Sequence, residues 1–260
     1  MSSNATDSPE SAANVSSLGP QRLDSESSDI RQLAELTAGL SADSLKQQLQ
    51  AIHALAALGG VGEPALAKFI QDRMAEQNPD DPTAAHGSAY QMLYQGSSAE
   101  AKALIQAFPD GLVCPQSDRG VDYRGLQMLL VQKKYQMADK VTMQKLCELA
   151  GEQAIERKWV YFTEINQMPL LDLQAIDLIW GLYSEDKFGW SKQRQLWLRL
   201  GQDWNRLWTQ LQWKTDGAWT RYPNEFIWDL SAPVGHLPLS NQLRGVRTMD
   251  SLLCHPAWSD

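Results

Sequence analysis

Two arginines near the C-terminus are the most explicit candidates for ligand binding. Arg244 and Arg247 stand three residues apart, a spacing that places two side chains on one face of a helix. Two guanidinium groups held there could each form bidentate hydrogen bonds with a carboxylate. Asp250 could orient Arg247, and Ser251 is a weaker polar candidate. On spacing alone, an ordinary solvated basic face is the commoner explanation.

Aromatic side chains gather in segments whose sequence does not predict a regular helix. Phe188 and Trp190 flank a glycine, whereas Trp219 and Tyr222 lie in a later segment that holds both glycine and proline. Turn residues of this kind predict loops, and aromatic rings on loops often belong to binding surfaces. Core packing is the alternative, and it explains any single ring better than it explains the group.

No arrangement of side chains predicts catalysis or a bound metal. Asp172 and Asp177 could form an acid–base set with His236, but a spacing of five on one helix turns the two carboxylates about 140° apart. No Ser, Cys or Thr stands in a nucleophile motif, and no glycine-rich phosphate loop follows a strand. His236 lies in a Gly-His-Leu-Pro segment, which predicts a structural turn in preference to a magnesium ligand. We therefore expect a protein that is not an enzyme.

Composition divides the chain near Gly120. All ten tryptophans follow that point, and residues 121–260 hold 16 basic and 16 acidic side chains against 7 and 15 in the first 120. A net charge of -8 also argues against nucleic-acid binding. We predict a disordered tail at 1–28, which is serine-rich and also acidic, a helical bundle at 29–115 and a second domain at 121–260.

Hydrophobic spacing predicts an all-α fold. Leucines and isoleucine recur at helical intervals between 45 and 58, and Pro64 suits the first turn of the next helix. In the second half, helices are expected at 138–150 and 170–182, with further ones at 193–200 and 204–211. Strands do not alternate with helices, so an α/β nucleotide-binding fold is not expected.

From Val121 onward the sequence resembles the genomes-uncoupled-four family, the porphyrin-binding activators of magnesium chelatase. Matching residues occur in order over about 140 positions. They are Asp122-Tyr123 with Leu126, Ala138-Asp139 with Thr142, Trp159 with Phe162, Pro169 with Asp172-Leu173 and Ile176-Asp177 leading to Trp180, Phe188-Gly189 with Ser191 and Gln193, Gly235 to Leu239, Asn241 to Gly245, and His255-Pro256. The helical segment before this part matches the arrangement in cyanobacterial members.

The resemblance implies a helical core, cupped like a hand, whose concave face binds protoporphyrin IX and its magnesium complex. It places Phe162, Phe188 and Tyr222 near that face, although relatives can carry Trp where Tyr222 stands. It also implicates the two arginines in ligand binding. The predicted porphyrin-binding residues are therefore Phe162, Phe188, Trp190, Trp219, Tyr222, Arg244, Arg247 and Ser251. A flat apolar macrocycle with two propionates needs such rings and cations.

The family also implies a partner, the large porphyrin-binding subunit of magnesium chelatase, which this protein would stimulate during chlorophyll synthesis. A cytoplasmic location is expected, with peripheral association at the thylakoid membrane, since no apolar run is long enough to span a bilayer. The alternative is a tetrapyrrole-sensing interaction module that does not activate the chelatase. The absence of a fused kinase or other effector favours the activator.

Overall fold

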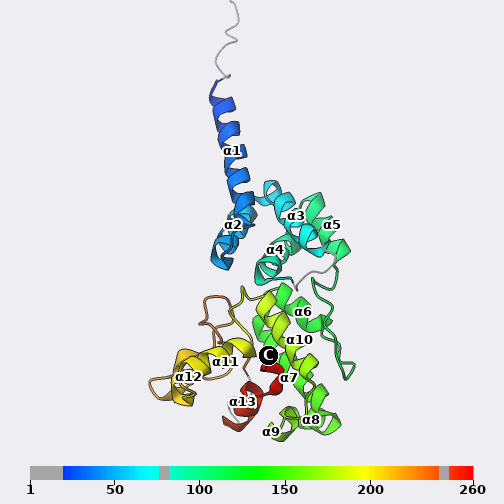
Figure 1. Cartoon of the computed structure of the whole chain (residues 1–260), viewed down its shortest axis with the longest axis vertical. Coiled ribbons are helices and arrows are strands. Elements are labelled where there is room, and N and C mark those ends of the chain that lie inside the picture. Colours follow the sequence, from blue (N-terminus) through cyan, green and yellow to red (C-terminus); the bar gives the residue numbers. More distant parts are fainter. Residues whose placement is uncertain (1–19, 76–81, 240–245, 260) are drawn as a thin grey trace, which may run out of the picture.

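A computed structural model describes residues 20–75, 82–239 and 246–259. Within these ranges the chain is almost entirely helical (Figure 1), and its strands form a single two-stranded antiparallel hairpin. The prediction of an all-α fold is therefore confirmed. No helix in the described part of the chain combines the length and the apolar character that a bilayer crossing requires.

The N-terminal part is a group of short helices from which α1 projects (Figure 1). Their bounds are α1 (Pro20–Gly39), α2 (Leu45–Ala57), α3 (Glu63–Met74), α4 (Ala84–Tyr94) and α5 (Ala99–Ala107). Helix α1 begins at Pro20, inside the range 1–28 that was expected to be a disordered tail. Further along α1, apolar side chains such as Leu33 and Leu36 pack on the core. Pro64 occupies the first turn of α3, as predicted.

The second part of the chain is built around two central helices. The elements are α6 (Arg124–Val131), α7 (Tyr135–Ala150), α8 (Glu152–Arg157), α9 (Phe162–Ile165), α10 (Leu170–Leu182), α11 (Trp190–Arg199), α12 (Trp204–Gln210), β1 (Lys214–Thr215), β2 (Ala218–Trp219) and α13 (Val246–Leu253). Trp180 of α10 is fully buried, and its indole N–H donates to the hydroxyl of Thr142 on α7 at 2.9 Å. This bond fixes α7 against α10.

Helix α4 joins the two parts. The side-chain amide of Gln91 donates to the carbonyls of Leu130 and Tyr183, both at 2.8 Å, and the group is buried. A Cβ at Gly87 would lie 1.9 Å from the carbonyl oxygen of Leu182. Only glycine permits this approach, so α4 and α10 pack with their backbones almost in contact.

Five tryptophans form a row along α11, α12 and the hairpin. The ring centroids of neighbouring members lie 4.7 to 5.8 Å apart, and Trp213 and Trp219 both pack on Trp208. The members are Trp197, Trp204, Trp208, Trp213 and Trp219. Trp204 and Trp208 share one face of α12 because they are four residues apart. The indole N–H of Trp213 donates to the carbonyl of His236 at 2.8 Å, which joins the row to the segment at 220–239.

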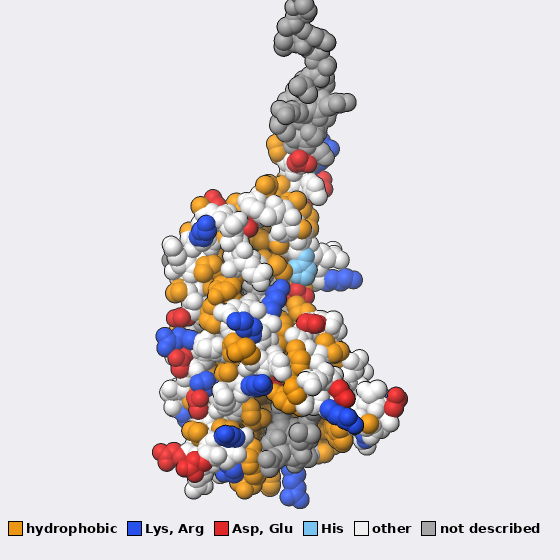
Figure 2. All heavy atoms as spheres, turned by 180° about the vertical axis from the view of Figure 1, so that it is seen from behind, with side chains coloured by type: hydrophobic (Ala, Val, Ile, Leu, Met, Phe, Trp, Pro, Cys, Tyr) orange, Lys and Arg blue, Asp and Glu red, His pale blue; other side chains and the backbone are white. Residues whose placement is uncertain are grey.

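The face seen in Figure 2 carries basic and acidic side chains interspersed among hydrophobic ones. This mixture agrees with the equal numbers of acidic and basic residues in 121–260.

Candidate functional site

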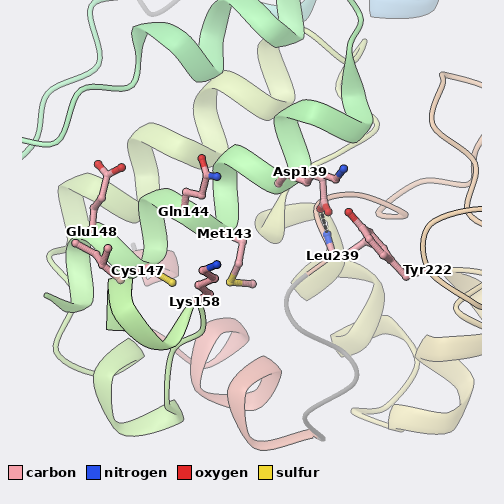
Figure 3. A pocket seen from close by; sticks show the side chains of 10 residues that line it. Asp139, Met143, Gln144, Cys147, Glu148, Lys158, Tyr222 and Leu239 are labelled. Carbon is pink, nitrogen blue, oxygen red and sulfur yellow. Dashed lines mark hydrogen bonds between the residues drawn. The ribbon is translucent and has the colours of Figure 1, made fainter. Parts of the chain in front are cut away.

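An open cavity of about 620 Å³ lies between α7, the end of α8 and the segment at 220–239 (Figure 3). We call it the α7 cavity. This volume is within the range of small-molecule binding sites. Its lining residues are Asp139, Lys140, Met143, Gln144, Cys147, Glu148, Ile155, Lys158, Tyr222 and Leu239.

Helix α7 supplies one wall through two adjacent rows. Asp139, Met143 and Cys147 are spaced four residues apart. The residues immediately after them form a second row with the same spacing, namely Lys140, Gln144 and Glu148. Side chains at this spacing lie above one another on one helix face. Eight residues of helix extend about 12 Å, so the wall is long enough to lie beneath a flat ligand.

Asp139 places a buried carboxyl in this wall. The side chain is 7 % exposed, and its Oδ1 accepts a hydrogen bond from the backbone N–H of Leu239 at 2.6 Å. Burial raises the pKa of this carboxyl to about 7 despite that bond and the nearby charge of Lys140. The group therefore titrates near neutral pH, whereas an exposed aspartate stays ionised.

Tyr222 stands across the cavity from α7. Its side chain is 41 % exposed, and its hydroxyl end points toward Asp139 in Figure 3. Burial raises the pKa of the phenol, and the Asp139 charge adds to this. The ring is supported from behind by Phe226 and Trp228, whose centroids lie 6.3 and 5.9 Å away. The ring that the sequence singled out thus lines the cavity.

Phe162 and Arg247 form a second pair, between α9 and α13. The guanidinium carbon of Arg247 lies 5.6 Å from the centre of the Phe162 ring, which is a cation–π distance. Arg247 is exposed, and Ser251 follows it by one turn on α13. None of these three residues lines the α7 cavity directly. Arg244 falls outside the described residues.

The structure buries two of the aromatic residues that were expected at an open surface. Phe188 is fully buried against Tyr135 and Trp180, and Trp190 is buried as the first residue of α11. They do not face an open surface, because the chain turns inward between them. Trp219 is 44 % exposed but ends the tryptophan row and does not line the cavity.

The turn between Phe188 and Trp190 has a clear physical cause. Gly189 adopts φ +127°, and a Cβ there would lie 2.7 Å from the Asp177 carboxylate. Asp177 also accepts the backbone N–H of Ser191 at 3.0 Å, close to the start of α11. Glycine marks a tight internal turn here, which is why its loop signal misled the sequence interpretation.

His236 and Asp172 are the other two residues that the sequence offered as candidates for chemistry. His236 is buried, its Nδ1 lies 2.6 Å from the Leu211 carbonyl and its Nε2 accepts the backbone N–H of Ile227 at 3.2 Å, so the predicted structural role is confirmed. Burial lowers the pKa of this imidazole. Asp172 lies in the first turn of α10 and accepts hydrogen bonds from Tyr123 and from the Asp118 backbone.

Sequence reasoning assigned no role to most of the cavity wall. Asp139 was noticed only as part of a matching motif, and no role was predicted for Lys140, Gln144 or Glu148. The available signal was the four-residue repeat of Asp139, Met143 and Cys147, which mixes a carboxyl with sulfur atoms on one stripe. That stripe is neither a normal core face nor a normal surface face.

The residues fit a flat, largely apolar macrocycle. Met143, Ile155 and Leu239 offer apolar contact, and Tyr222 offers a ring for offset stacking. Lys140 and Lys158 bring positive charge to the same cavity. Among the described residues, no group of three or more His, Cys, Asp or Glu could hold a metal ion.

Two protein-family models match the chain in succession. The model described as GUN4-like covers residues 116–256, and the model described as an ARM-like repeat domain at the GUN4 N-terminus covers residues 24–109. The α7 cavity lies wholly within the first of these matches.

Several curated proteins are similar over much of their length. The Ycf53-like protein of Synechocystis sp. is 45% identical over 87% of this chain and 97% of its own length. An uncharacterized ycf53 protein of Pyropia yezoensis is 39% identical over 88% of this chain and 97% of its own length. The chloroplastic tetrapyrrole-binding protein of Arabidopsis thaliana is 36% identical over 52% of this chain and 54% of its own length.

Solved structures share the fold of just over half of the chain. The structure of GUN4 from Chlamydomonas reinhardtii is 34% identical with a TM-score of 0.54, and covers 57% of this chain and 95% of that chain. The ligand-free structure of Arabidopsis thaliana GUN4 is 36% identical with a TM-score of 0.50, and covers 54% of this chain and all of that chain.

Proposed function

The chain belongs to the GUN4-like family in its cyanobacterial form, and on this premise we propose that it binds a tetrapyrrole in the α7 cavity. The observation that carries the proposal is the cavity itself. Its apolar residues, its tyrosine ring and its lysines match the three needs of a flat macrocycle with acidic substituents. The Arabidopsis relative is named as a tetrapyrrole-binding protein.

The ligands we propose are protoporphyrin IX and its magnesium complex. Covering about 300 Å² of apolar ligand surface would contribute roughly 7 kcal/mol before the costs of association. Micromolar binding, which corresponds to about 8 kcal/mol, therefore requires additional polar contacts. Arg247 beside Phe162, together with Arg244, is proposed to supply these through the propionates.

The proposed role is regulatory and non-catalytic. We infer that the protein presents the macrocycle to the large subunit of magnesium chelatase and eases substrate entry or product exit. Cavity openness supports this, because a ligand held in an open cavity stays accessible to a partner. Meeting a partner at the thylakoid would require only peripheral association with the membrane.

A titration followed by the absorption bands of the pigment tests binding. Wild-type protein should give a saturable shift with both ligands. Met143→Trp places a large ring in the cavity wall and should abolish the shift, while Leu198→Trp, on the exposed side of α11, should leave it unchanged. Equal binding by both variants would place the ligand elsewhere.

A chelatase assay tests the regulatory role separately. The rate of magnesium insertion should rise when the protein is added, and the rise should vanish with Met143→Trp. A protein that binds the pigment tightly without changing this rate would be a sensing module.

A further inference from the structure

Lys158 is a cation of the α7 cavity that neither the sequence pattern nor the family resemblance singled out. It lines the cavity, and in Figure 3 its side chain lies between the sulfur atoms of Met143 and Cys147. Its ammonium forms no hydrogen bond or ion pair with any residue that the structure describes. An unpaired cation beside an apolar wall is poised for an anionic ligand group.

The neighbouring cation, Arg157, differs from Lys158 because other side chains already hold its charge. Arg157 pairs with Glu164 at 2.6 Å and stacks over the rings of Trp159 and Tyr161, at 4.9 and 4.3 Å. Arg157 therefore holds the α8–α9 connection together. Lys158 takes no part in that cluster, so the fold does not use its charge.

The backbone of Lys158 aims the side chain. It closes α8 in the left-handed region with φ +61°, and its N–H donates to the carbonyls of Ala154 and Ile155. Glycine or asparagine usually takes this position. A lysine here accepts a small conformational cost, and its side chain extends back over the cavity, away from the helix axis.

A short stretch of chain links Lys158 to the ring that lies under the predicted propionate-binding arginine. Phe162 follows it by four residues, and Arg247 lies over the Phe162 ring at 5.6 Å. Arg247 does not itself line the α7 cavity, whereas Lys158 does. The buried carboxyl of Asp139 lies beside Leu239 and Tyr222, away from Lys158 in Figure 3.

We propose that Lys158 binds one of the two propionates and so fixes the orientation of the macrocycle in the α7 cavity. The carboxylate edge of the macrocycle then faces the end of α8. The opposite edge faces Tyr222 and Asp139. This inference rests on the proposed tetrapyrrole function.

The test compares Lys158→Asn with two ligands, protoporphyrin IX and its dimethyl ester, in one detergent-containing buffer. Asparagine tolerates the left-handed backbone, so the substitution removes the charge without straining α8. The diacid should bind the variant roughly three- to tenfold more weakly, as expected for one charge-assisted contact at a half-open site. Binding of the ester should not change.

Two further variants complete the design. Lys133→Asn is the matched control, since Lys133 is also left-handed with φ +57° but does not line the cavity; it should bind both ligands as wild type does. Lys158→Arg keeps the charge and should retain diacid binding. Equal effects of Lys158→Asn on both ligands, or none on either, would overturn the inference. Failure of the wild type to bind either ligand would instead refute the proposed function.

Discussion

The backbone N–H of Leu239 donates to the carboxyl of Asp139 at 2.6 Å, across 100 residues of sequence. This bond ties α7 to the Gly-His-Leu-Pro segment and closes one end of the cavity. It also holds a carboxyl in a place where water is largely excluded. Ionisation of the Asp139 carboxyl is therefore expected to lower the free energy of unfolding.

The first prediction concerns the pH dependence of stability. The pKa of Asp139 is about 7 in the folded protein and near 3.8 when unperturbed. Between these values the unfolded chain releases a proton that the folded protein keeps, so stability falls as pH rises and levels off above about 7. Asp139→Asn should remove this dependence and raise the free energy of unfolding at pH 8 by on the order of 2 kcal/mol, with little change at pH 4.

Urea unfolding across that pH range would measure the effect. Asp118→Asn removes an exposed carboxyl from the same part of the chain and serves as the control. If the wild type and Asp139→Asn gave parallel curves at all pH values, Asp139 would not be a strained buried acid.

The second prediction concerns the ring of Tyr222. Tyr222→Ala should weaken porphyrin binding roughly three- to tenfold, because a stacking ring contributes about 0.5–1.5 kcal/mol beyond its buried area. Tyr222→Trp should match or exceed the wild type, since it keeps a larger ring. Leu198 is similarly exposed at 40 % but lies outside the cavity, so Leu198→Ala should bind normally in the same titration.

The third prediction concerns the paired arginines. Replacing Arg244 and Arg247 together by Ala should weaken binding of the diacid by roughly tenfold or more, because two charge-assisted contacts are lost. Helical content, followed by circular dichroism, should not change. Arg199→Ala removes an exposed cation from the last turn of α11 and should have no effect. Full affinity in the double variant would leave the propionates without the proposed partners.

The fourth prediction concerns the joint between the N-terminal helices and the rest of the chain. Gln91→Leu removes both amide hydrogen bonds and leaves the carbonyls of Leu130 and Tyr183 buried without that donor. The free energy of unfolding should fall by about 2 kcal/mol or more. Gln95→Ala, on the exposed end of the same helix, should change it little. Equal denaturation midpoints would mean that the joint contributes no stability.

Much of the helical fold could be predicted from local spacing. The apolar repeat between 45 and 58 corresponds to α2, and the helix predicted at 170–182 coincides with α10. These elements follow rules that act within one or two turns. The start of α1 at Pro20 was missed, because packing further along that helix outweighs the polar composition of its first part.

The cavity could be predicted only in part. Of the aromatic rings singled out in the sequence, Tyr222 lines the cavity, whereas Phe188 and Trp190 turn inward at Gly189. The bond between Asp139 and Leu239 depends on a contact that no local pattern encodes. Sequence patterns report which face of a helix is apolar, whereas a cavity depends on what a distant segment leaves uncovered.

The row of five tryptophans determines what an optical experiment can report. Indoles at centroid separations of 4.7 to 5.8 Å exchange excitation energy with their neighbours. Emission from the protein is therefore a collective signal, and a pigment that accepts energy from one ring drains all of them. Quenching of intrinsic fluorescence will count bound pigment without locating it, so position must come from single-tryptophan variants in which one emitter remains.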